Sequence, residues 1–458
     1  MRERAAAARA RGGPRIRART SARAARAARG KRHGRPAAAA GGELSVSNGW
    51  TGGQYSVYRA IFGLYLLLHF AALLPWGTEL FSNQGLLPEA SLSPLTRAFP
   101  NLLACFDSPP VVTALLTLAM VSSLCFLLGA YDRWAALIIW YVWACLYGRN
   151  PLISDPSLPF VGWLLLAHAL LPVRPYGSWS RRGDPDPGVG WRMPDAVFAA
   201  AWILMALAYS YSGYTKLSSP SWLDGSALAR IVENPLARPS GLRELVLALP
   251  DPLLRLGSWT ALGLELTFAP LALLRRMRPW LWSALLGMHL GLATLVDFAD
   301  LSLGMGVLYL FTFNPAWVRP TRAESTDLMF YDGACALCHG VVRFVLAEDR
   351  SGHSFRFAPL DSDAFRARVP ASARASLADS VIVGTAEGEL LERSAAVLYM
   401  LGRLGGVWRV LAVLGRLVPP RLRDALYNAV AATRYRVFGT KTEACPLLPP
   451  ALRQRFDT

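Results

Sequence analysis

Two cysteines separated by two residues lie in the segment "MFYDGACALCHG", which spans residues 329–340. They are Cys335 and Cys338, and a histidine follows the second one directly. This spacing serves three kinds of chemistry: thiol–disulfide exchange, half of a zinc site, and covalent attachment of a c-type haem. The predicted strands and helices around the pair indicate which of these three chemistries it serves.

The pair stands between a predicted strand and a predicted helix. "DLMFYDG" is typical of a buried strand that ends in a turn, and Val341, Val342 and Val345 follow at helical spacing. A strand, a CxxC pair and a helix in this order are the thioredoxin-like redox arrangement. The first sulfur would then lie at the helix N-terminus, where the dipole and free N–H groups stabilise a thiolate. We therefore predict Cys335 as a nucleophile of lowered pKa, and Cys338 as the resolving thiol, shielded one turn into the helix.

Three alternatives remain open at this stage. The letters C-A-L-C-H match the haem attachment pattern. A zinc site needs four ligands, and His339, His353 and Cys445 are the residues that could complete one. Free cysteines are also often simply part of a core. The strand–pair–helix order favours redox chemistry, and we predict no metal.

The rest of the C-terminal segment reads as a mixed α/β pattern. "HSFRFAPL" predicts a second strand, and "DSVIVGTAEGELLER" predicts a hairpin with its turn near Gly388. "SAAVLYMLGRLGG" predicts a helix with Ser394 as its cap and Gly405 as its stop. Two further helices follow. We therefore predict a thioredoxin-like α/β domain over residues 326–458.

This segment resembles the DCC family of predicted thiol-disulfide oxidoreductases. "FYDGACALC" matches the family's Asp-x-x-Cys-x-x-Cys signature through Asp332, Cys335 and Cys338. "ERSAAVL" stands where the family has Arg-Ser-x-Ala, and "RYRVFG" followed by Cys445 matches its C-terminal end. The resemblance implies a redox enzyme acting on protein thiols or disulfides. It leaves Cys445 as either a third redox partner or a packing residue.

The first three hundred residues have the composition of a membrane protein. The chain is 53% hydrophobic and 17% charged, against about 25% charged for an average globular domain. Apolar stretches of roughly membrane-spanning length recur along it. We predict eight spans, over 57–76, 111–130, 134–148, 158–173, 196–214, 256–274, 280–296 and 301–317. The predicted fold is thus a polytopic α-helical membrane bundle over 50–319, followed by the thioredoxin-like domain.

Loop charge predicts the orientation of the bundle. Basic clusters precede the first span and follow the fourth, the sixth and the eighth, and the intervening loops are acidic or balanced. With eight spans these clusters share one side, which the positive-inside rule assigns to the cytoplasm together with both termini. We expect an integral protein of the inner membrane in contact with lipids. Lys216 and Cys335 then fall on opposite sides of the bilayer.

The net charge of +17 is concentrated at the N-terminus. Residues 1–40 hold thirteen Arg or Lys and one acid. Such a tract of Arg, Ala and Gly cannot bury enough apolar area to fold, so we predict a disordered tail over 1–48. It is either a solvated extension or a polybasic segment on an anionic leaflet. We expect no nucleic-acid partner.

A few ionisable residues lie inside or beside the predicted spans. An intramembrane acid is costly, so Glu265 is expected to face the bundle interior or a wet cavity. His69, His168 and His289 are most simply explained by hydrogen bonds between helices. Lys216 lies among aromatic residues at a span end, where desolvation could make it a base; the alternative is an interfacial lysine whose amine reaches water.

Around Lys216 the sequence resembles the vitamin K-dependent γ-carboxylase and its bacterial relatives, the HTTM (horizontally transferred transmembrane) family. The resemblance rests on Lys216-Leu217, a short spacer and Trp222-x-x-Gly225, together with "LFSNQGLLP" at 80–88. The resemblance implies that Lys216 is the base acting on a quinone. A loop His of the carboxylases and their large C-terminal region have no counterpart here. We therefore expect a quinone-like or lipid-like ligand pocket rather than protein carboxylation.

Overall fold

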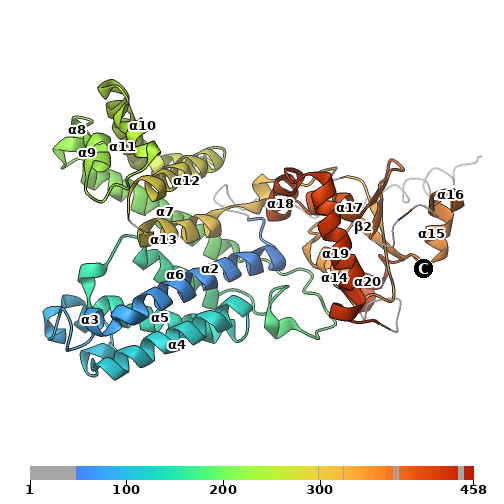
Figure 1. Cartoon of the computed structure of the whole chain (residues 1–458), viewed down its shortest axis with the longest axis horizontal. Coiled ribbons are helices and arrows are strands. Elements are labelled where there is room, and N and C mark those ends of the chain that lie inside the picture. The colour runs from blue at the N-terminus through green and yellow to red at the C-terminus, as the bar shows by residue number, and fades with distance from the viewer. Residues whose placement is uncertain are drawn as a thin grey trace, which may run out of the picture. The chain divides into compact units, whose positions relative to one another are not determined.

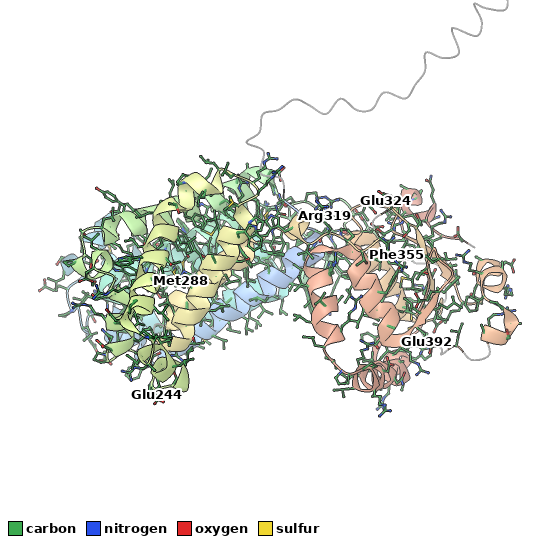
Figure 2. All side chains as sticks on the ribbon, turned by 90° about the horizontal axis from the view of Figure 1, so that it is seen from above. Glu244, Met288, Arg319, Glu324, Phe355 and Glu392 are labelled. Carbon is green, nitrogen blue, oxygen red and sulfur yellow. The ribbon has the colours of Figure 1, made fainter. Side chains whose placement is uncertain are left out.

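The computed structural model describes residues 48–457 apart from 298, 323, 375, 376, 378–380 and 442–447. The predicted N-terminal tail, except Asn48, and the candidate Cys445 lie outside these residues. A helical part comes first and a small mixed-sheet part follows (Figure 1). Arg319 and Glu324, labelled in Figure 2, mark the connection between them.

The helical part contains long helices joined by short ones. Its α-helices are α2 (Gly52–Leu73), α3 (Gly77–Phe81), α4 (Pro109–Leu128), α5 (Asp132–Arg149), α6 (Leu158–Ala169), α7 (Asp195–Lys216), α8 (Pro220–Leu223), α9 (Ala227–Glu233), α10 (Gly241–Leu247), α11 (Asp251–Ala272), α12 (Arg278–Leu295) and α13 (Ala299–Thr312). Short 3₁₀ helices are η1 (Leu74–Trp76), η2 (Ala90–Leu92), η3 (Pro94–Arg97), η4 (Leu102–Ala104), η5 (Pro151–Ile153), η6 (Trp179–Arg181) and η7 (Pro315–Trp317).

Each of the eight apolar stretches forms a helix, but the helices differ in length. Three are long and apolar enough to cross a membrane by length and composition: Gly52–Phe81, which joins α2 to α3, then α4 and α7. α6 and the Leu301–Thr312 segment of α13 are shorter apolar helices. Crossing of a membrane by any of the eight predicted spans stays a prediction. α2 packs along α4, and α7 packs along α11 (Figure 1).

The surface of the helical part is more apolar than that of a typical soluble protein. Large apolar side chains such as Leu68, Leu118 and Leu207 are exposed on α2, α4 and α7. The interior is an apolar core that also holds a few charged groups, among them Arg149, which pairs with Asp107 at 3.0 Å. An exposed apolar surface of this extent marks contact with lipid or with another protein.

The C-terminal part is built on a four-stranded sheet. Its elements are β1 (Asp327–Tyr331), α14 (Ala336–Glu348), β2 (Phe355–Pro359), α15 (Asp363–Arg368), α16 (Ala371–Arg374), β3 (Ile382–Gly384), β4 (Leu390–Glu392), α17 (Arg393–Leu404), α18 (Gly406–Arg416), α19 (Pro420–Phe438) and α20 (Pro450–Arg453). The strand order is β2-β1-β3-β4, with β1 parallel to β2 and antiparallel to β3.

This topology contains the predicted units. α14 is the crossover between the two parallel strands, and β3 with β4 is the predicted hairpin. Gly388 lies in the hairpin turn with a φ of 92°, which L side chains rarely adopt. Phe355, labelled at the start of β2 in Figure 2, belongs to the core between the sheet and α14. The carboxyl end of β1 therefore leads directly into the cysteine pair.

The predicted cap of the next helix is wrong. α17 begins at Arg393, directly after β4, so that Glu392 occupies the cap position and makes no side-chain capping bond. Ser394 lies inside the first turn, and its hydroxyl donates a hydrogen bond to Asp424 of α19. Gly405 ends the helix as predicted, with a φ of 72°.

We predict that Arg403→Met lowers the free energy of unfolding of the C-terminal part by about 3 kcal/mol, because it leaves a buried carboxylate unpaired. Arg403 donates from Nε to Asp327 Oδ2 at 2.7 Å, and both side chains are fully buried. The control, Arg356→Met, breaks a partly exposed pair with Asp457 and costs below about 1 kcal/mol. Urea unfolding of the full chain, followed by pulse proteolysis, measures both; equal losses would contradict the prediction.

Candidate redox site

Cys335 is the residue that caps the N-terminus of α14. Its backbone is extended, with φ −94° and ψ 118°, and its sulfur accepts a hydrogen bond from the backbone N–H of Cys338 at 3.4 Å. A sulfur in this position lies against the free N–H groups and the positive end of the helix dipole. The position predicted for Cys335 is therefore confirmed.

Hydrogen bonds on two sides fix the backbone of the cysteine turn. The N–H of Cys335 donates to the carbonyl of Asp332 at 3.3 Å, which closes the turn after β1. The segment after α19 then pairs with the turn: Ala336 donates to Gly439 at 3.3 Å, and Lys441 donates to Ala334 at 2.9 Å. The first sulfur therefore has a defined position before any substrate arrives.

Asp332 is held as an anion beside the pair. Its Oδ1 accepts the N–H of Ala334 at 2.9 Å, and its Oδ2 accepts hydrogen bonds from Tyr435 and, at 3.2 Å, from Arg434. Burial alone would raise the pKa of this carboxyl group, but the bonds from Tyr435, Ala334 and Arg434 lower it below its ordinary value. Asp332 is therefore ionised at neutral pH.

The environment of Cys338 disfavours its thiolate form. A carboxylate oxygen of Asp332 and the two cysteine sulfurs lie within 4.8 Å of one another. Burial, then the hydrogen bond and charge of Cys335, and then the charge of Asp332 raise the pKa of Cys338 to about 12. A second negative charge would be poorly solvated and repelled. Cys338 therefore stays protonated at neutral pH, and the nucleophile and resolving roles of the pair stay predictions.

One detail of the predicted geometry is wrong. We expected Cys338 to be the more shielded thiol, yet Cys335 is 0% exposed and Cys338 is 6% exposed. The reason is that the Gly439–Lys441 segment covers the turn at Cys335, whereas Cys338 lines an apolar cavity. Access to the pair therefore leads through that cavity or requires the covering segment to move.

The same three residues are the candidate group for a metal ion. Asp332, Cys335 and Cys338 present donor atoms close together. The other residues considered for zinc are bonded elsewhere: His339 Nε2 lies 2.8 Å from the carbonyl of Gly333, and His353 Nδ1 lies 2.8 Å from that of Ser351. Asp332 is already bonded to three protein groups, which disfavours it as a ligand. The described donors number three where structural zinc takes four.

Two site residues carried no predicted chemical role. Arg434 and Tyr435 belong to α19, about a hundred residues after Asp332, and they bond its carboxylate. Their only signal in the sequence was their place in the "RYRVFG" motif. A contact between residues this far apart in sequence leaves no periodic pattern from which it could be predicted.

Lys216 is paired rather than isolated. Its Nζ donates to Glu265 Oε1 at 2.5 Å and lies 4.6 Å from the ring centre of Trp222. Glu265 is buried at the α7–α11 contact, as the cost of an intramembrane acid led us to expect. The lysine thus reaches from the end of α7 into the bundle.

The three helical histidines all pair with tyrosines. The ring–hydroxyl distances are 2.7 Å for His69 with Tyr147, 2.5 Å for His168 with Tyr55 and 2.6 Å for His289 with Tyr209. The interpretation of these histidines as hydrogen-bond partners between helices is confirmed. His289 differs in one respect, because its Nδ1 is buried without a hydrogen-bond partner among the described residues.

The fold and the cysteine geometry define a class of protein that exchanges thiols and disulfides through a helix-capping cysteine. A family model described as "DCC1-like thiol-disulfide oxidoreductase" matches residues 329–440. The chain is 33% identical over 129 residues to "Uncharacterized protein YuxK" of Bacillus subtilis (strain 168), which covers 28% of this chain and 92% of that protein. It is also 33% identical over 135 residues to "DCC family protein At1g52590, chloroplastic" of Arabidopsis thaliana, which covers 29% of this chain and 77% of that protein.

These matches show that the chain belongs, through its C-terminal part, to the DCC1-like thiol-disulfide oxidoreductase family. The matched segment contains the cysteine pair together with Asp332, Arg434 and Tyr435. No solved structure was found to match the chain.

We predict that a thiol-alkylating reagent at pH 7 modifies Cys335 well before Cys338. The pKa of Cys338 is raised to about 12, so its labelling rate should climb only in strongly alkaline solution. Asp332→Asn removes a negative charge and should lower the pH at which Cys338 becomes reactive. Asp363→Asn, an exposed carboxylate on α15, is the control and should leave it unchanged. Peptide mass spectrometry separates the sites; equal, slow labelling of both thiols would contradict the assignment.

Proposed function

We propose that the chain is a membrane-tethered thiol–disulfide oxidoreductase that uses Cys335 as nucleophile and Cys338 as resolving thiol. The observation that carries this proposal is the position of Cys335 at the N-terminus of α14, with its sulfur on the N–H of Cys338. The sheet order and the place of the pair after β1 are consistent with a thioredoxin-like domain. The substrates are protein thiols or disulfides.

The reaction follows from the charges at the site. The Cys335 thiolate attacks one sulfur of a substrate disulfide, forms a mixed disulfide and releases the other substrate sulfur as a thiolate. Cys338 then loses its proton and attacks the Cys335 sulfur, which releases the second substrate thiol and leaves an intramolecular disulfide. The proton of Cys338 passes to the departing substrate sulfur, which therefore leaves as a thiol. Read backwards, the same steps oxidise a substrate dithiol.

Tethering is supported by the helical part. Its exposed leucines and buried charged groups are the arrangement that lipid surroundings favour. We propose that the eight helices α2, α4–α7 and α11–α13 cross the inner membrane and that both termini lie in the cytoplasm, as the loop charges predict. The redox pair then works on the cytoplasmic side.

A second candidate function concerns the helical part itself. A cavity of about 470 Å³ is lined by apolar residues of α2, α12 and α13, among them Leu286 and Val307, and by His289. Tyr209, which bonds His289, also accepts a hydrogen bond from Tyr309 at 2.6 Å. An apolar cavity with a few polar groups suits a small ligand. We propose that it takes a quinone or lipid, in a carboxylase-like (HTTM) bundle where Lys216 is the base; the C-terminal part could then serve only for docking.

The mixed-disulfide intermediate gives the first test. Cys338→Ser should trap a stable adduct when the reduced chain meets glutathione disulfide, because the resolving thiol is absent. Cys335→Ser should trap none and lose turnover. The intact mass of each variant, measured under non-reducing conditions, shows whether an adduct has formed. The opposite trapping pattern would exchange the two roles, and no adduct with either variant would remove the proposed function.

The base proposed in the helical part is tested by Lys216→Arg. Arginine keeps a positive charge opposite Glu265 but cannot lose its proton, so quinone-dependent turnover should vanish while membrane insertion persists. Lys216→Ala should lose turnover as well, and Lys441→Ala, an exposed lysine of the C-terminal part, should not. Normal quinone turnover by the purified Arg variant would exclude Lys216 as the base.

A further inference from the structure

A large apolar cavity adjoins the redox pair. It has a volume of about 460 Å³, and its walls include Leu337 and Val341 of α14, Val397 of α17, and Leu426 and Val430 of α19. Cys338 and Asp332 also line it. The cavity is therefore a path by which an apolar group can reach the less covered sulfur of the pair.

The cavity wall continues into an exposed apolar surface on α18 and α19. We define the α18–α19 surface by Leu411, Leu414, Leu417, Leu422, Leu426 and Val430. Leu417 is 77% exposed and Leu426 is 61% exposed. Along α19 the exposed residues recur every fourth position, which places them on one helix face. An isolated exposed leucine needs no explanation, but a cluster of this kind marks a contact site.

Arginines accompany these leucines. Residues 406–438 contain six arginines and one acid, which gives a net charge of +5 (six minus one). The acid, Asp424, is already bonded to Ser394. Apolar residues together with clustered arginines on amphipathic helices are typical of segments that lie on anionic lipid surfaces. The charge therefore favours an anionic partner with an apolar interior.

The position of α18 favours a bilayer over a soluble partner. The N–H of Gly406, at its first residue, donates to Val318 at 2.8 Å, shortly after the end of the apolar helix α13. The N–H of Val407 donates to Gln54 at 2.9 Å, in the first turn of α2. α18 therefore starts where two helices proposed to cross the bilayer reach the same end. The end of a spanning helix lies at the lipid–water interface, so α18 starts at that interface.

We propose that the α18–α19 surface lies on an anionic bilayer surface and that the cavity beside Cys338 opens toward the lipid. This inference rests on the membrane tethering in the proposed function, but not on the redox reaction. The cysteine pair would then act on thiols and disulfides that are presented at the membrane surface.

Site-specific photocrosslinking of the full chain in vesicles tests this surface. A benzophenone amino acid replaces Leu417, and in a matched control it replaces Arg366, which is exposed on α15. Vesicles contain phosphatidylcholine with phosphatidylglycerol, or phosphatidylcholine alone. We expect lipid adducts from position 417 in anionic vesicles and none from position 366. Double reversal, Arg416→Glu with Arg421→Glu, should reduce the adduct yield roughly thirtyfold, because two basic residues that each contribute about 1 kcal/mol of attraction are lost.

Each other outcome overturns the inference. Adducts from position 417 to a second copy of the chain, to its helical part or to no molecule would exclude the bilayer as the occupant. Equal yields in neutral and anionic vesicles would exclude the role of the arginines. Flotation of the chain with vesicles measures tethering separately, and reduction of glutathione disulfide in detergent measures the redox reaction separately. A chain that floats and turns over without a lipid adduct disproves this inference alone.

Discussion

The placement of one sulfur at the start of α14 is the constraint on which the redox site depends. Cys335 must follow a turn that leaves β1, and Asp332 forms that turn through both its backbone and its side chain. α19 then fixes the carboxylate, because Arg434 and Tyr435 bond to it. A strand, a turn and a distant helix thus combine to hold the two sulfurs and a carboxylate side by side.

The other end of the same helix connects the redox site to the helical part. Glu348, the last residue of α14, is fully buried and accepts the N–H of Gly53 at 2.7 Å and the indole N–H of Trp408 at 2.7 Å. Gly53 belongs to the first turn of α2, where a negative charge is favoured by the helix dipole. α14 therefore carries the cysteine at one end and the contact with α2 at the other.

Local sequence patterns predicted the helices and strands, whereas contacts between residues far apart in sequence are known only from the structure. The apolar runs predicted the eight helices. The apolar run before Cys335 predicted β1, and the helical spacing after it predicted α14, because each pattern depends on neighbours in sequence. Ser394 was misassigned as a cap because nothing nearby showed that β4 runs directly into α17. The greater burial of Cys335 follows from residues 439–441, and the Lys216–Glu265 pair joins different helices. No local pattern encodes such contacts.

The central claim is that Cys335 and Cys338 form one reversible two-electron couple. The direct measurement is equilibration of the full chain in glutathione buffers of graded potential, followed by acid quenching, alkylation and peptide mass spectrometry. We predict that both thiols disappear together into one disulfide and return together on reduction, while Cys105 and Cys145 remain thiols. A pair that stays reduced in the most oxidising buffer, or that resists alkylation until a chelator is added, would contradict the account.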